Sequence, residues 1–124
     1  MSKNILIIDD EEDMQIYLET LLQKAGYETK IAVNGEEGLK TLENFVPDLI
    51  TLDILMPKKS GLNFFKSIRE NKKLNKIPVV VVSGVTAYNE FFRDEKNVGP
   101  TEFAEKPIVP ESFLHQVKNL LGEA

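Results

Sequence analysis

The chain has 124 residues, of which 42% are hydrophobic and 28% charged, and its 15 Lys and Arg against 20 Asp and Glu give a formal net charge of −5. This is the composition of one globular domain, and the acidic balance argues against a nucleic-acid binder, which needs a basic face. The lack of cysteine excludes disulfides and thiol chemistry, and a single histidine cannot build a multi-histidine metal site. The sequence has no signal peptide and no apolar run long enough to cross a membrane, so we expect a cytoplasmic chain with no membrane contact.

Short apolar runs alternate with segments of helical periodicity, with no linker-like stretch between them, so we expect one domain over residues 1–124. In chain order, the pattern predicts a strand at 5–8, a helix over 14–25, a strand at 29–33, a helix capped by Asn34, a strand at 49–52, a helix around 62–68, a strand at 79–82, a helix near 87–96, a strand at 101–104 and a helix over 110–121. Gly26 stands where a helix C-cap belongs, and Pro110 suits a first helical turn.

Five strand–helix units predict an α/β fold, a doubly wound parallel sheet with right-handed crossovers and helices on both faces. The strands are short, apolar and without alternation, which is typical of strands buried on both sides. Open sheets of this kind bind their ligands at the carboxyl ends of the strands, where the strand order reverses. The residues that follow the strands are therefore the candidates for a site.

Charged and polar residues stand at four of these strand ends: Asp9 and Asp10, Asp53, Ser83 and Lys106. Carboxylates gathered this closely repel each other by about 4 kcal/mol per pair at about 4 Å, so either some are protonated or a cation neutralises them. Mg²⁺ suits such a site, because it takes carboxylates, waters and a phosphate as ligands. A metal, an ammonium and a hydroxyl around one carboxylate predict phosphoryl transfer onto an aspartate.

Each of these residues also has an ordinary structural explanation. Asp10 belongs to the run of acids that suits the positive N-terminus of the first helix, and a lone Asp after a strand is commonly a cap or turn residue. Lys106 alone would be a surface charge before a turn. The coincidence of polar residues at four strand ends favours the functional interpretation.

Five segments carry a resemblance to the receiver domain of two-component response regulators, in particular to the chemotaxis-regulator type. They are ILIIDDEEDM at residues 5–14, VNGEEGLKTL at 33–42, PDLITLDILMPKKSGL at 47–62, VVVVSG at 79–84 and EFAEKP at 102–107. The resemblance extends over essentially the whole chain. It implies a flavodoxin-like sheet of strand order 2-1-3-4-5 with five helices.

The resemblance also implies roles for the residues of the predicted site. Asp53 is expected to be the phosphoacceptor. Asp10 would be a direct Mg²⁺ ligand and Asp9 a ligand through water, with Asp53 and the Leu55 carbonyl completing the protein's share. The hydroxyl of Ser83 and the ammonium of Lys106 would hold the phosphoryl oxygens.

The implied function is that of a signalling module that catalyses only its own phosphorylation and dephosphorylation. A histidine kinase or phosphotransfer protein would donate to Asp53. Ser83 and Phe103 would then move, and the surface made by the fourth helix, the fifth strand and the fifth helix would change shape. That surface would control a downstream output protein or an effector domain missing from this chain, and it is a possible homodimer interface.

Three smaller expectations follow. The family often has a cis bond before the proline of the lysine–proline pair, so we expect one between Lys106 and Pro107 although such bonds are rare. Leu55 and Val85 are apolar where the family modulates hydrolysis, which predicts a long-lived phosphoaspartate. His115 points away from the apolar face of the last helix, so it should be an exposed surface residue.

Two other classes of protein share parts of this pattern, and so does a receiver without chemistry. A flavodoxin-type electron carrier needs a Gly- and hydroxyl-rich phosphate loop after the first strand, where this chain has DDEED. A Mg²⁺-dependent phosphatase usually has a second Asp two residues after the first, where this chain has Leu55. A degenerate receiver would lack part of the acidic, hydroxyl and lysine set, which is complete here.

Overall fold

The computed structural model describes residues 3–54, 61–84 and 99–123. In chain order its elements are β1 (Asn4–Ile8), α1 (Glu12–Lys24), β2 (Glu28–Ala32), α2 (Gly35–Leu42), β3 (Leu49–Asp53), α3 (Gly61–Arg69), β4 (Val79–Ser83), β5 (Thr101–Glu105) and α5 (Pro110–Leu120). Each strand begins and ends within one residue of its prediction. The predicted helix near residues 87–96 lies outside the described residues, within which four helices are present.

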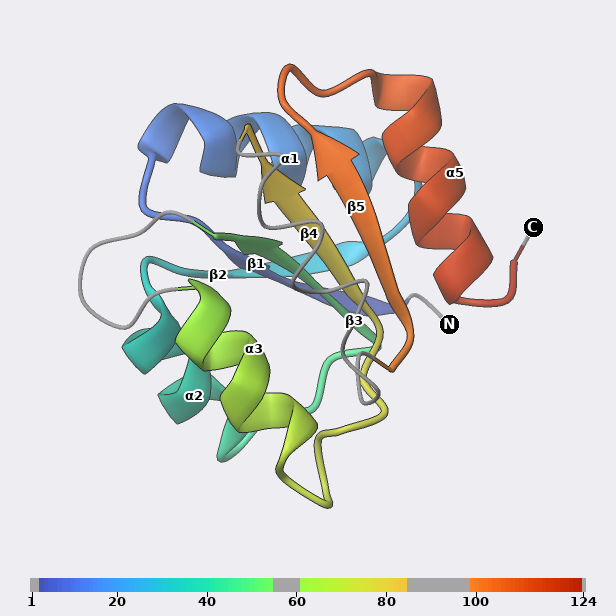
Figure 1. The fold of residues 1–124 in the computed structure, drawn as a ribbon. Helices are drawn as coiled ribbons and strands as arrows, with labels where there is room; N and C mark the ends of the chain where they lie inside the picture. Colours follow the sequence, from blue (N-terminus) through green and yellow to red (C-terminus); the bar gives the residue numbers. More distant parts are fainter. Residues whose placement is uncertain (1–2, 55–60, 85–98, 124) are drawn as a thin grey trace.

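All five strands pair in parallel, in the order β2-β1-β3-β4-β5 (Figure 1). This confirms the predicted flavodoxin-like sheet. The strand order reverses at β1, which has β2 on one side and β3 on the other. The carboxyl ends of β1 and β3 therefore border the crevice in which such sheets bind ligands.

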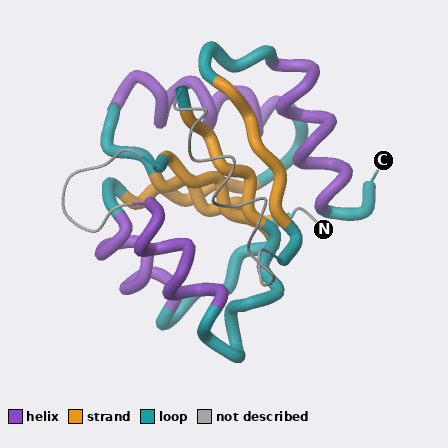
Figure 2. The backbone as a smooth tube through the Cα atoms, in the orientation of Figure 1, coloured by secondary structure: helices purple, strands orange, loops and turns teal. Residues whose placement is uncertain are grey.

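Two helical layers enclose the sheet: α1 and α5 cover one face, and α2 and α3 cover the other (Figures 1 and 2). Alternate residues of β1 divide between the two cores, so Ile5 and Ile7 pack under α1 and α5 while Leu6 and Ile8 pack under α2 and α3. Burial on both faces explains why the strands are almost purely apolar. None of the described helices is long and apolar enough to cross a membrane.

The helix ends use the residues predicted to form them. Gly26 has a φ of 97°, a conformation that favours glycine, and follows Ala25, the C-cap of α1. The side chain of the N-cap Asn34 accepts a hydrogen bond from the Glu37 N–H at 2.8 Å, and the Glu37 side chain accepts one from the Val33 N–H, just before the cap, at 3.2 Å. Pro110 is the first residue of α5. These local signals mark where α1 ends and where α2 and α5 begin.

Candidate functional site

The sheet register brings the predicted polar residues to one edge. Asp9 directly follows β1, and Asp53 is the last residue of β3; their predecessors Ile8 and Leu52 are paired across the two strands. Ser83 ends β4, and its carbonyl accepts a hydrogen bond from the Lys106 N–H at 3.1 Å. Four strand ends thus contribute side chains to the same edge, as the sequence predicted.

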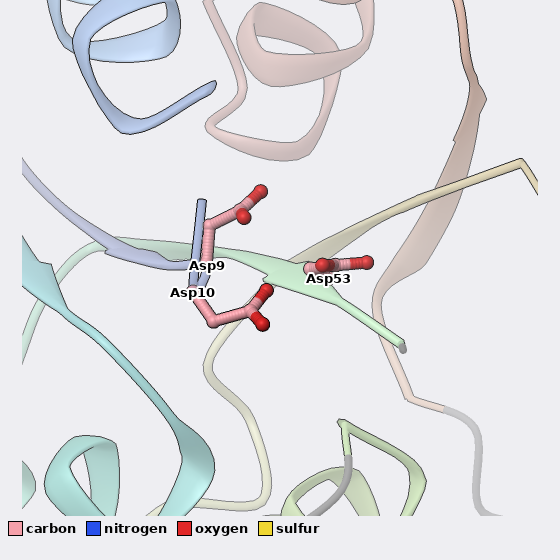
Figure 3. Close-up of side chains that lie close together, drawn as sticks. All are labelled: Asp9, Asp10 and Asp53. Carbon is pink, nitrogen blue, oxygen red and sulfur yellow. The ribbon is translucent and has the colours of Figure 1, made fainter. Parts of the chain in front are cut away.

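Asp9, Asp10 and Asp53 form an acidic cluster in which one carboxylate oxygen of each residue lies within 4.8 Å of the others (Figure 3). Asp9 and Asp53 are only 1% and 4% exposed, whereas Asp10 lies at the surface. Asp10 also lies just before α1, so it is able to interact with the positive N-terminus of that helix and to be part of the acidic cluster. Oxygen ligands grouped in this way suit a hard divalent cation such as Mg²⁺.

The carboxylate of Asp9 is held firmly and is poorly compensated. Its Oδ1 accepts a hydrogen bond from the Glu11 N–H at 2.9 Å, and its carbonyl accepts one from the Gln15 side chain at 2.7 Å. Its Oδ2 is buried and has no hydrogen-bond partner among the described residues. Burial raises the pKa of Asp9, and the hydrogen bond from Glu11 and the charge of Lys106 offset only part of that increase. A cation beside Oδ2 would relieve this unfavourable charge.

Lys106 supplies a positive charge at the edge of the acidic cluster. Its ammonium lies 3.9 Å from Asp53 Oδ1 and 3.8 Å from Glu11 Oε1. The Lys106 side chain is 24% exposed, so it is accessible from solvent as well as from the cluster. An ammonium in this position is able to pair with an anionic group placed on Asp53.

Most of the predicted site residues lie close together in the structure, and two of the predicted positions lie outside the described residues. Asp9, Asp10, Asp53, Ser83 and Lys106 all come to the same sheet edge. The predicted ligand Leu55 and the predicted hydrolysis position Val85 lie outside the described residues.

Three further expectations fall on the last strand and helix. Phe103 is partly buried in β5 and packs against the core under α2 and α3, so it lies in the same strand that leads to Lys106. The peptide bond between Lys106 and Pro107 is cis, and His115 is exposed, as the sequence analysis expected.

Two residues of the site were missed by the sequence analysis. Glu11 was grouped with the acids of the first helical turn, and Gln15 was not singled out. Both contact the site only because α1 packs its first turn over the end of β1. No local pattern in the sequence marks such contacts between elements.

Comparison with known proteins gives one consistent family. A family model described as "Response regulator receiver domain" matches residues 5–118. PhoP of Bacillus subtilis, an alkaline phosphatase synthesis transcriptional regulatory protein, is 35% identical over 123 residues, which are 98% of this chain and 49% of PhoP. The chain thus spans about half the length of that relative.

Other relatives match over their full length. DivK of Brucella anthropi, a polar-differentiation response regulator, is 32% identical over 124 residues, all of both chains. The crystal structure of the chemotaxis response regulator CheY4 of Vibrio cholerae has a TM-score of 0.86 and 28% identity, covering 97% of this chain and 99% of CheY4.

Proposed function

Because this chain belongs to the family of response regulator receiver domains, we propose that Asp53 accepts a phosphoryl group from the phosphohistidine of a histidine kinase or phosphotransfer protein. The observation that carries this proposal is the buried Asp53 carboxylate, which lies within 4.8 Å of two further carboxylates and 3.9 Å from the Lys106 ammonium. In the transfer, a carboxylate oxygen of Asp53 bonds to phosphorus while the bond to the donor's imidazole nitrogen breaks, and the imidazole leaves with the electron pair. Such chemistry depends mainly on positioning and charge compensation.

The acidic cluster is the proposed Mg²⁺ site. Asp10 would bind the ion directly, Asp9 through water, and Asp53 and the Leu55 carbonyl would complete the ligands from the chain. The bound ion would neutralise the carboxylates and the negative charge of the transferred group. The buried, unpartnered Oδ2 of Asp9 supports this assignment, because it is a buried acceptor that a hydrated cation satisfies.

Ser83 and Lys106 are the proposed phosphoryl-binding groups, and Phe103 is the proposed switch residue. The phosphoryl group would shift an existing equilibrium between two states by its different contacts in each. The surface of the fourth helix, β5 and α5 would then carry the signal to an output protein or an effector domain, or form a homodimer. The module would catalyse no reaction other than its own phosphorylation and dephosphorylation, and it would act in the cytoplasm.

The test is phosphorylation by acetyl phosphate with and without Mg²⁺, followed by intact-mass measurement. We expect one phosphoryl adduct that depends on Mg²⁺ and disappears in Asp53→Asn. Asp13→Asn is the matched control, because Asp13 is an exposed acid on α1 outside the cluster. An adduct that persists in Asp53→Asn, or one that forms equally without Mg²⁺, would refute the proposal.

A further inference from the structure

The Lys106 ammonium is shared between two carboxylates, and the proposed function uses only one of them. It lies 3.8 Å from Glu11 Oε1 and 3.9 Å from Asp53 Oδ1, so neither partner is favoured by distance. The Glu11 side chain is 67% exposed, whereas that of Asp53 is 5% exposed. Lys106 thus bridges the buried part of the site and its solvent-exposed rim.

The backbone of Glu11 is fixed by the site itself. Its N–H donates to Asp9 Oδ1 at 2.9 Å, and its carbonyl accepts from the Gln15 N–H at 3.0 Å, which is the first hydrogen bond of α1. Glu11 is the N-cap of α1, but its side chain makes no capping hydrogen bond. The carboxylate is therefore free of the helix end and reaches Lys106.

The charge balance at this edge is negative. Among the described residues that form the acidic cluster or pair with Lys106, the Lys106 ammonium is the one positive charge. It stands against four carboxylates, those of Asp9, Asp10, Asp53 and Glu11. A bound divalent cation would leave one negative charge uncompensated. The arriving phosphoryl group adds further negative charge, so both the phosphoryl group and the Glu11 carboxylate are then able to pair with the Lys106 ammonium.

We propose that Glu11 is a positioning residue that competes with the phosphoryl group for Lys106 and thereby slows phosphoryl acceptance. The proposal rests on the function proposed above. In the unphosphorylated protein the ammonium is shared between Glu11 and Asp53. During transfer the ammonium leaves Glu11 and pairs with the phosphoryl oxygens.

The test is the second-order rate constant for phosphorylation by acetyl phosphate with saturating Mg²⁺ at low ionic strength. Glu11→Gln removes the charge at nearly constant volume and should raise the rate constant about two- to fivefold, the range expected for an exposed ion pair. The gain should shrink as salt is added, because exposed charges are screened. Glu11→Asp keeps the charge and should remain near the wild-type rate.

Glu12→Gln is the matched control, because Glu12 is the neighbouring exposed acid of α1 and makes no ion pair with Lys106. Its rate constant should equal that of the wild type. Melting temperatures of all variants should agree, so that a change in rate reports charge rather than folding.

A double-mutant cycle decides whether Glu11 acts through Lys106. In a Lys106→Ala background, Glu11→Gln should leave the slower rate unchanged. If Glu11→Gln raises the rate constant equally in the Lys106→Ala background, then Glu11 repels the phosphoryl donor directly and the proposal is wrong. The proposal is also wrong if Glu11→Gln alone leaves the rate constant unchanged or lowers it. Failure of the wild type to accept a phosphoryl group on Asp53 would instead refute the proposed function.

Discussion

Asp9 is a buried carboxylate of the proposed Mg²⁺ site, and its burial in the folded protein is unfavourable. It is 1% exposed, and burial is the main reason why its pKa is raised. A raised pKa means that the folded protein binds this proton more tightly than the unfolded chain does. The free energy of unfolding therefore falls as the pH rises through the pKa of folded Asp9, and the full penalty is present above it.

Asp9→Asn should accordingly stabilise the protein at neutral pH in the absence of Mg²⁺. Asparagine keeps an oxygen that accepts the Glu11 N–H and removes the buried charge. Urea denaturation at several pH values should show the difference vanishing in acid, below the ordinary Asp pKa, where the carboxyl is protonated in both states. Saturating Mg²⁺ should stabilise the wild type and not the variant; a variant less stable than the wild type at every pH would contradict this account.

Thr51 is a second buried residue whose polar atom is not satisfied. It is 1% exposed in β3, and its hydroxyl has no hydrogen-bond partner among the described residues. Thr51→Val replaces the hydroxyl by a methyl group of similar size, so the free energy of unfolding should rise by about 1 kcal/mol.

Thr29 provides the control of opposite sign. Its hydroxyl accepts a hydrogen bond from the Gln23 side chain at 3.0 Å and donates one to Glu19 at 3.1 Å. Thr29→Val should therefore not stabilise the protein. Equal effects of the two substitutions, measured by urea denaturation, would show that the Thr51 hydroxyl carries no penalty.

The start of α3 is packed directly against the end of β3, and Gly61 makes this possible. A Cβ at residue 61 would overlap the carbonyl oxygen of Asp53 and lie 2.6 Å from the Ile54 Cα, both backbone atoms that have no room to move. The Gly61 N–H also donates to the Ile54 carbonyl at 3.1 Å. The helix is thus attached to the strand end that carries the proposed phosphoacceptor.

Gly61→Ala should lower the free energy of unfolding by about 1–3 kcal/mol, as expected for overpacking, and should slow phosphoryl acceptance because the backbone of Asp53 is displaced. Gly84→Ala is the control at the same sheet edge, where the nearest atom to a new Cβ is the Lys106 Cβ at 3.9 Å. Thermal denaturation and the acetyl phosphate rate should both distinguish the two variants. A Gly61→Ala protein as stable as Gly84→Ala would contradict the packing argument.

The elements and the main site residues were predictable because their signals are local. An apolar run predicts a buried strand wherever it occurs, Asn34 and Gly26 mark helix ends by their own chemistry, and the topology of parallel sheets gathers strand ends at one edge. Asp9, Asp53 and Lys106 could therefore be assigned to one site from their positions after strands.

Contacts between distant elements were not predictable in this way. Arg69 reads in the sequence as a basic residue in the last turn of a helix, but it is 8% exposed, and its guanidinium donates to the carbonyls of Ile77 and Pro100 at 2.7 and 3.2 Å. Burial lowers its pKa to about 10. The arginine of α3 thus joins the segments that lead into β4 and β5, a role that depends on three-dimensional packing and has no sequence pattern of its own.

The acidic cluster with the buried Asp9 lies at the carboxyl ends of the strands, and a second cluster of polar contacts lies at the amino ends. There the Tyr27 hydroxyl donates to Glu123 Oε1 at 2.7 Å, and the Lys3 ammonium lies 3.4 Å from Glu123 Oε2 and donates to the Leu121 carbonyl at 3.1 Å. These contacts join the segments before β1 and β2 to the segment after α5, and Figure 1 shows the two chain ends on the same side. Their effect on stability should be separable from the chemistry of the site.

Tyr27→Phe tests this separation. It removes the hydrogen bond to Glu123 and should lower the free energy of unfolding by about 1 kcal/mol near neutral pH, while the acetyl phosphate rate stays unchanged. Burial and, after it, the hydrogen bond to Glu123 raise the pKa of Tyr27 to about 12, and the same bond lowers the pKa of Glu123. The folded state thus holds the Tyr27 proton more tightly than the unfolded chain, and the stabilisation by Tyr27 is lost as the pH rises from about 10 towards 12.

The contribution of Glu123 to stability is lost as the pH falls below the ordinary Glu pKa. The difference in the free energy of unfolding between wild type and Tyr27→Phe, measured by urea denaturation, should therefore be largest between these two pH limits. Tyr17→Phe, at an exposed tyrosine of α1, should leave the free energy of unfolding near neutral pH unchanged. A Tyr27→Phe effect that is the same at pH 7 and pH 12 would contradict the assignment.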